Sequence, residues 1–209
     1  TRVRSSAASD VYKRQVRILF GLMKKLVIAD RLNPMIKQIF SHYDDYQGGI
    51  IALGAIAYTI QLYCDFSGTM DAVMGVAQIF GVTMPENFQR PFFSKSISEF
   101  WKRWHITLGT WFKDYIFYPV TMSKPMKNLT SSARKKLGNH FGPLLAGSIA
   151  LFCVWFCNGL WHGSAWGYIF FGMYHFVLIL SGNIIAPAVT AFNKKLHINS
   201  ECFAYKVFQ

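Results

Sequence analysis

The chain has 209 residues, of which 52% are hydrophobic, 17% aromatic and only 15% charged. Soluble domains carry about 25% charged residues and disordered chains are poor in aromatic residues, so neither class fits. Four cysteines in this length also exclude a small disulfide-stapled secreted scaffold. Residues 141–193 contain no Asp, Glu, Lys or Arg. Because about 20 apolar residues cross a bilayer, this run predicts two crossings in an all-α, polytopic integral membrane protein.

The net charge of +12 comes from 22 Lys and Arg, most of which lie in residues 2–37 and 90–136. Both blocks border apolar segments. Basic segments beside membrane spans are typical of the cytoplasmic side, and they also attract anionic lipid headgroups. Nucleic-acid binding is the other function that such charge suggests. The basic residues alternate here with Trp and Phe, so we expect membrane lipids and no nucleic acid as partners.

Residues 1–15, TRVRSSAASDVYKRQ, contain no apolar signal-peptide core. The stretch from Arg4 to Gln15 resembles a translated sequencing adapter, and we predict that residues 1–15 form a non-native leader. Residues 16–209 are then expected to be one partial membrane domain of a longer protein.

The first predicted helix covers residues 16–32, where Arg17, Lys24 and Arg31 recur every seven residues on one stripe. Two lysines at the centre of a span would be costly, so we expect this helix to lie in the membrane interface and to end before Pro34.

An uncharged segment, residues 46–64, is long enough to span a bilayer. Asp65 and Asp71 follow it, and we expect them to cap helices on either side of a turn at Ser67-Gly68, with cation binding as the alternative. Residues 72–84 are too short for a crossing and predict a buried or re-entrant helix.

The prolines of residues 85–91 predict a non-helical hinge. Ser96 and Glu99 form a capping-box pattern, which begins a predicted amphipathic helix that ends at Pro119 and lies in the interface. Residues 123–140 hold six basic residues, counting one histidine, and no acid, so they predict a cytoplasmic loop.

Three histidines have apolar surroundings, and His162 is the most informative. It lies in Asn158-Gly-Leu-Trp-His-Gly-Ser164, which contains a predicted break at residues 159–163 between two uncharged spans. Irregular backbone at membrane depth is tolerated where it lines a wet cavity, and a histidine there can act as a general base. The alternative is a structural histidine that bridges two helices. For His105 and His175 the residues alone favour structural roles, and the spacing of the three predicts no metal site.

Several motifs together resemble the membrane-bound O-acyltransferase (MBOAT) family. They occur in one order along the chain and are spread over residues 16–180: Gly21-Leu-Met-Lys-Lys-Leu-Val-Ile-Ala-Asp30, Tyr63-Cys-Asp-Phe-Ser-Gly68, Pro85-Glu-Asn-Phe88 with Pro91, Ser98-Glu-Phe-Trp-Lys-Arg-Trp-His-Ile-Thr-Leu108, Trp111-Phe-Lys-Asp-Tyr115 and Gly159-Leu-Trp-His-Gly163. The pattern is most similar to the bacterial branch that acylates alginate and teichoic acid.

The resemblance implies a multi-helix core around a central tunnel in the bacterial plasma membrane. It implies transfer of an acyl group, with acetyl as the favoured one, to a hydroxyl of an extracellular or cell-wall polysaccharide. The donor would be a cytoplasmic thioester, either acetyl-CoA or an acyl carrier protein. An extracytoplasmic partner acyltransferase is also expected. The alternatives are D-alanyl transfer to teichoic acid and a non-enzymatic transporter or scaffold subunit.

The family's catalytic histidine maps onto His162 and its second signature histidine onto His105. Trp161 and Asn158 are then candidates for shaping the substrate site. Lys102 and Arg103 are candidates for attracting an acidic donor, with lipid headgroup contact as the alternative. No tightly bound cofactor is expected.

Overall fold

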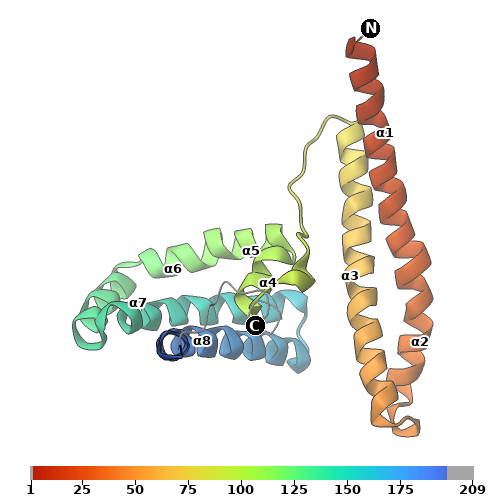
Figure 1. Cartoon of the computed structure of the whole chain (residues 1–209). Helices are drawn as coiled ribbons and strands as arrows, with labels where there is room; N and C mark the ends of the chain where they lie inside the picture. The colour runs from red at the N-terminus through yellow and green to blue at the C-terminus, as the bar shows by residue number, and fades with distance from the viewer. Residues whose placement is uncertain (1, 197–209) are drawn as a thin grey trace. The chain divides into compact units, whose positions relative to one another are not determined.

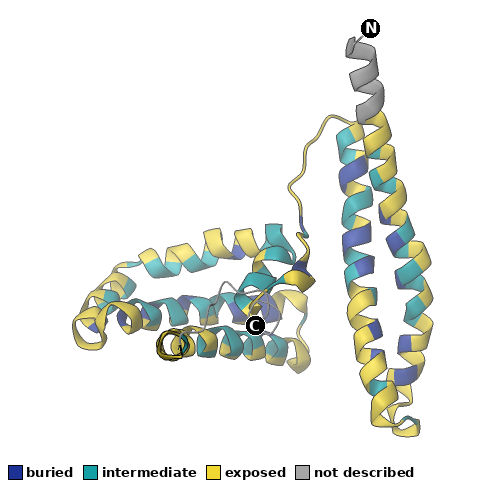
Figure 2. Cartoon of the chain, viewed as in Figure 1, coloured by how far each residue is buried: buried dark blue, intermediate teal, exposed yellow. Residues whose placement is uncertain are grey.

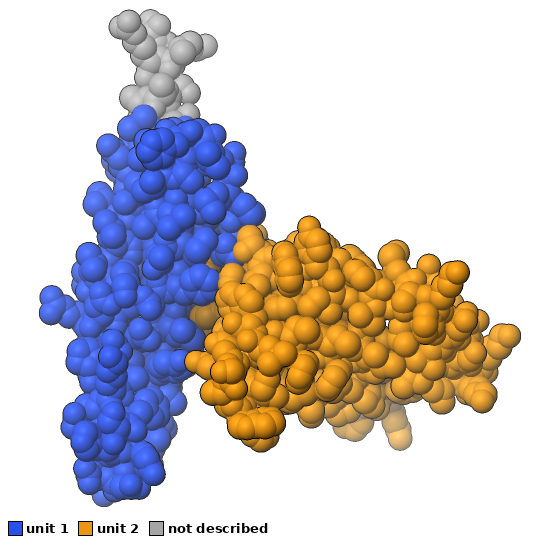
Figure 3. Space-filling model, turned by 180° about the vertical axis from the view of Figure 1, so that it is seen from behind, with its two compact units in different colours: residues 1–87 blue, residues 88–209 orange. Residues whose placement is uncertain are grey.

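A computed structural model describes the backbone of residues 2–196 and the side chains of residues 11–196. The chain divides into two compact units, Thr1–Asn87 and Phe88–Gln209, which Figure 3 colours separately. The described residues are almost entirely helical, which confirms the predicted all-α class. Figure 1 labels the helices of each unit.

The first unit is a pair of long antiparallel helical arms. One arm runs without interruption through α1 (Arg2–Leu22), the π-helical turn η1 (Met23–Ala29) and α2 (Asp30–Ser41), and the other is α3 (Gly48–Ile79). The 3₁₀ turn η2 (Tyr43–Asp45) joins them. The predicted helix at residues 16–32 is confirmed, and residues 2–15 continue it toward the N-terminus. Its predicted end was wrong, because Pro34 lies inside α2 and removes only one backbone hydrogen bond.

The α3 helix corrects two predictions. It continues through Ser67 and Gly68, so there is no turn there, and residues 72–79 belong to it rather than to a separate re-entrant helix. Asp65 and Asp71 therefore cap nothing. They lie in mid-helix, where side chains of the first arm form ion pairs with them.

The predicted non-helical hinge is confirmed over residues 82–90, and the second unit begins within it, at Phe88. The 3₁₀ turn η3 (Pro91–Phe93) follows. Then come four short helical segments: α4 (Ile97–Arg103), α5 (Ile106–Phe112), the π-helical η4 (Lys113–Phe117) and α6 (Tyr118–Met122). The long helices α7 (Lys124–His162) and α8 (Trp166–Lys195) complete the unit and pack along each other (Figure 1).

The predicted capping box is present, because the Ser96 hydroxyl accepts a hydrogen bond from the Glu99 backbone N–H at 3.1 Å. The single long helix predicted after it is wrong. Trp104 is extended and His105 is left-handed, with φ 48° and ψ 53°, so α4 and α5 are separate helices. A bridge between Trp104 and Phe88 holds the break open. The helix also does not end at Pro119, which opens α6 in the position where proline is tolerated.

The basic segment at residues 123–140 is helical, so the predicted loop was wrong. It forms the first arm of α7, which turns sharply at Gly138, where φ is 80°. A β-carbon at Gly142 would lie 2.5 Å from the Arg134 Cα, so only glycine allows this close return of the chain. The α8 helix likewise continues past Pro187 to Lys195, beyond its predicted end.

Three helices, α3, α7 and α8, are long and apolar enough to cross a membrane. Only 17%, 22% and 11% of their most apolar windows is buried, so most of their apolar surface is left for lipid or further protein. Figure 2 shows exposed residues along their outer faces and buried residues where helices meet.

Candidate active site

A close helix crossing builds the floor of the candidate site in the second unit. A β-carbon at Gly159 of α7 would lie 2.6 Å from the Tyr168 carbonyl oxygen, and one at Gly172 of α8 would collide with the Trp155 carbonyl. Both glycines are helical, so they serve close packing here. The break predicted at residues 159–163 is therefore shorter and later. It begins at Gly163, whose φ of 155° suits glycine alone.

His162 is the last residue of α7, directly before this break. Its ring centroid lies 4.9 Å from that of Trp161, 5.6 Å from that of Phe171 and 6.1 Å from that of Tyr168. The side chain is exposed within the unit. The structure thus places His162 at a helix end, on aromatic rings, with its other side open.

His105 comes to the same place from a different element. Its ring centroid lies 5.9 Å from that of Trp161, so one indole contacts both predicted histidines. Burial lowers the pKa of His105, and the neighbouring His162 lowers it further. His105 is therefore neutral at pH 7, with one ring nitrogen that carries a proton and one that does not.

The backbone at His105 is strained. A left-handed conformation is uncommon for a residue with a β-carbon and costs on the order of 1–3 kcal/mol. The contacts of Trp104 maintain it: this ring lies edge-on to Phe88 at 5.0 Å and stacks on Phe100 at 5.6 Å. Strain that the surroundings enforce in this way is frequent at active sites.

An aromatic cluster supports the two histidines and includes residues that sequence reasoning did not assign to a site. Trp101 lies edge-on to Trp155 at 4.9 Å and to His175 at 4.9 Å. His175 also stacks on Trp155 at 5.2 Å, and its Nδ1 donates a hydrogen bond to the Phe171 carbonyl at 2.9 Å. The helix-packing role predicted for His175 fits this contact. The apolar sequence around His175 did not indicate that α8 contacts Trp101.

Two buried polar atoms in this cluster have no hydrogen-bond partner among the described residues. They are the indole nitrogen of Trp101, a donor, and the amide oxygen of Asn158, an acceptor. Asn158 is one turn after Trp155 and one turn before His162 on α7, and it is only 9% exposed. Unpaired buried polar atoms are costly. A hydroxyl group can satisfy either atom, because its oxygen accepts from an indole N–H and its proton is donated to an amide oxygen.

The predicted basic residues do not join this cluster. Lys102 is exposed. Arg103 donates to the Glu99 carboxylate at 2.6 Å. That carboxylate also accepts from the Lys95 backbone N–H, and these bonds lower the pKa of Glu99. Within residues 11–196 no group of three or more His, Cys, Asp or Glu side chains is placed to hold a metal ion.

Comparison with known proteins decides the family. A family model described as the membrane-bound O-acyltransferase family matches residues 4–134. The chain belongs to the MBOAT family. With its three apolar helices it is therefore a membrane protein of that family. The matched segment includes His105 and ends before His162.

Several curated bacterial proteins of this family are similar to the chain. Probable alginate O-acetylase AlgI of Azotobacter vinelandii is 38% identical over 159 residues, which cover 76% of this chain and 28% of that protein. Teichoic acid D-alanyltransferase of Bacillus subtilis is 33% identical over 174 residues, 80% of this chain and 40% of that protein. Peptidoglycan O-acetyltransferase of Helicobacter pylori is 32% identical over 155 residues, 74% of this chain and 26% of that protein. The chain thus spans less than half the length of these relatives.

Proposed function

We propose that the complete protein is an O-acyltransferase of the bacterial plasma membrane that crosses it several times. It moves an acetyl group from a cytoplasmic thioester, acetyl-CoA or an acyl carrier protein, to a hydroxyl of an extracellular or cell-wall polysaccharide. The contact of both His105 and His162 with the Trp161 ring carries the proposal. Two of the three relatives described above are named as O-acetylating enzymes, which favours acetyl over D-alanyl as the group.

In this mechanism His162 is the general base. Its ring nitrogen accepts the proton of the acceptor hydroxyl while the oxygen attacks the thioester carbonyl carbon. The carbon–sulfur bond then breaks, and the departing thiolate takes the proton back from His162. General-base help of this kind contributes about 10²–10⁴-fold.

His105 serves the donor side of the same step. As a neutral imidazole it donates its N–H to the thioester carbonyl oxygen, on which negative charge develops during attack. Its lowered pKa keeps it in this form at neutral pH. A transporter or scaffold subunit has no need of two histidines and a strained backbone at one indole, so the geometry favours the enzyme.

The acceptor hydroxyl is also recognised beside the base. We assign this to the unpaired Trp101 indole N–H and Asn158 amide oxygen, on the aromatic cluster that also carries His162. The donor itself is a substrate, and an extracytoplasmic acyltransferase is the expected partner protein.

The general base is tested by His162→Gln in the complete protein, with transfer of labelled acetyl to polysaccharide normalised to the protein in the membrane. Glutamine can hydrogen-bond but cannot take the proton, so we expect transfer to fall by about 10²–10⁴-fold. The matched control is His140→Gln, because His140 is exposed and contacts the Asn183 carbonyl instead. Transfer within threefold of wild type by the His162 variant would refute the base.

Hydroxyl recognition is tested by Trp101→Phe, which removes the indole N–H and keeps an aromatic ring. Loss of one hydrogen bond from a buried site is worth about 1–3 kcal/mol, so we expect KM for the polysaccharide to rise about tenfold with little change in kcat. Trp111→Phe is the matched control, because Trp111 is 49% exposed and, among the rings that the structure describes, contacts those of Phe112 and Tyr115 alone. A fall in kcat at unchanged KM would show that Trp101 only supports the fold.

A further inference from the structure

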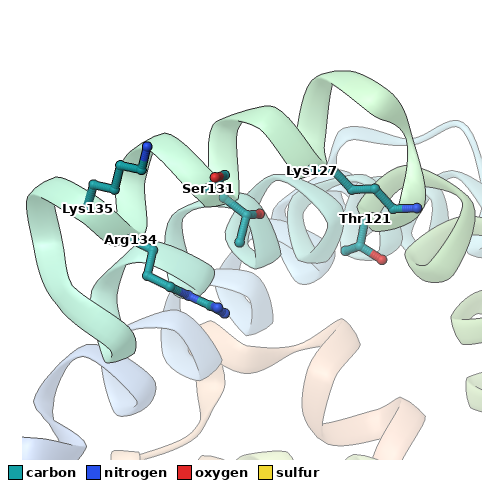
Figure 4. Close-up of a pocket in the computed structure, with 6 residues that line it drawn as sticks. Thr121, Lys127, Ser131, Arg134 and Lys135 are labelled. Atoms are coloured by element: carbon teal, nitrogen blue, oxygen red, sulfur yellow. The ribbon is translucent and has the colours of Figure 1, made fainter.

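A second site candidate lies away from the histidines, where α6 meets the first arm of α7. A pocket of about 590 Å³ opens there. Its lining residues are three cations and three hydroxyls: Thr121, Lys127, Thr130, Ser131, Arg134 and Lys135. Figure 4 shows them on the two elements, with Thr121 from the end of α6 and the others from α7.

The helical period explains why these residues share one face. Lys127, Ser131 and Arg134 are spaced i, i+4 and i+7 along α7. Gly142 packs against the backbone of Arg134, so the returning arm of α7 holds this residue in place. The face is therefore a fixed feature of the fold.

The charge of the pocket is uncompensated. No Asp or Glu occurs in residues 115–196. None of the three lining cations forms an ion pair with any residue that the structure describes. Three like charges on one pocket repel one another unless an anion joins them.

The three lining hydroxyls differ in whether they already donate a hydrogen bond within the protein. Thr121 donates to the Phe117 carbonyl at 2.9 Å, and Thr130 donates to the Met126 carbonyl at 2.8 Å, so both protons are already used. Ser131 has no hydrogen-bond partner among the described residues. It is thus the lining hydroxyl whose proton is available to a ligand.

We propose that this pocket binds a phosphate group. Arg134 supplies a fork that matches two phosphate oxygens, Ser131 supplies a third donor, and Lys127 and Lys135 supply positive charge. The ligand's phosphate has two sources beside a basic membrane interface: the headgroup of an anionic phospholipid, or a phosphorylated soluble molecule such as a coenzyme. The proposal concerns binding alone and does not depend on the acyl-transfer chemistry.

The test measures binding to the purified complete protein in detergent. One arm titrates phosphatidylglycerol with diacylglycerol as its phosphate-free reference, and the other titrates coenzyme A with pantetheine as its reference. We expect one pair to show binding that requires the phosphate. Phosphate-dependent binding in the first arm identifies the lipid headgroup, and in the second arm the soluble phosphate. Absence of it in both arms overturns the proposal.

Four variants separate a built site from general surface charge. Ser131→Ala, which changes no charge, should weaken binding about three- to tenfold, while Thr130→Val should not. Arg134→Gln should weaken it by about tenfold or more. Lys136→Gln removes the same charge from a neighbouring position outside the pocket, and should weaken it less. Equal losses within each matched pair would show ordinary attraction of a basic surface and would overturn the proposal.

Discussion

The two units of this chain both carry polar groups among apolar helices, but they differ in whether those groups have partners. In the first unit charges are buried and paired. Lys24, only 8% exposed, donates to the Ser67 hydroxyl at 3.0 Å and to the Asp71 carboxylate at 2.5 Å. In the second unit, the groups at the candidate active site are histidines and aromatic rings, and two buried polar atoms are left unpaired.

The ion pairs of the first unit form a network around Asp65 and Asp71. Arg17 donates to both Asp71 and Glu86, and these bonds raise its pKa despite burial. The π-helical η1 places the successive residues Lys24 and Lys25 where both reach α3, and Lys25 pairs with Asp65 at 2.8 Å. Every charge in this network has a partner, which is typical of a structural element. The second unit keeps unsatisfied groups, which is typical of a site that awaits a ligand.

The largest expected effect is the loss of folding stability when the ion-pair network of the first unit is broken. Asp71→Asn removes the carboxylate that compensates Lys24, and breaking a buried ion pair in this way costs about 3–5 kcal/mol of folding free energy. Thermal unfolding of the complete protein in detergent measures it. Asp44→Asn, at an exposed acid of the same unit, should change stability by less than about 0.5 kcal/mol.

The double variant Lys24→Met with Asp71→Asn sharpens this result. It removes the buried cation together with its partner, and Arg17 keeps Glu86. Replacing a buried ion pair by apolar groups is often close to neutral, so most of the lost stability should return. A double variant as unstable as Asp71→Asn alone would contradict the pairing.

The next effect concerns the helix crossing under the histidines. A β-carbon at Gly172 meets the Trp155 carbonyl, which is backbone and cannot yield, so Gly172→Ala should cost about 1–3 kcal/mol. Because Trp155 stacks on His175, acyl transfer should fall as well. Gly182→Ala, on the same helix with nothing within 4 Å, should have no such cost and should leave transfer unchanged. Equal behaviour of the two variants would show that the crossing is looser than described.

The features that depend only on neighbouring residues were predicted correctly from the sequence. The capping box at Ser96, the proline hinge and the three apolar spans follow from nearby residues and are present. Long-range contacts decided the rest. The helical period continues through Trp104 and His105, so the pattern alone extends the helix, but pairing of Trp104 with Phe88 breaks it.

The sequence also did not indicate which residues form ion pairs with Asp65 and Asp71 in the middle of α3. Asp71 is 47 residues from Lys24, and a caps-and-turn interpretation suited the local Ser67-Gly68 pair better than a distant lysine. The periodic placement of Arg17 and Lys24 on one stripe was the available signal, because buried charges on one face of a helix call for opposite charges on its neighbour. For the site, the motifs indicated His105 and His162, while the surrounding aromatic rings required the fold.

The smallest expected effect is a shift in one titration, and it tests directly whether the two histidines share a site. Burial is the main cause that lowers the pKa of His105, and the charge that His162 acquires at low pH is the second. His162→Gln removes only the second cause. The pKa of His105 should therefore rise, but stay below its ordinary value of about 6.5 because burial persists. Chemical-shift titration of labelled histidines in the complete protein measures this, and His140→Gln is the control.

The lowered pKa of His105 also makes the folding stability depend on pH, with a definite sign. A lowered pKa means that the unfolded chain takes up the proton of His105 at a higher pH than the folded chain, so folding stability is lost as the pH falls through this range. The loss that His105 contributes should be smaller in His162→Gln. An unchanged pKa of His105 in that variant would separate the two histidines and remove the geometric basis for a shared catalytic site.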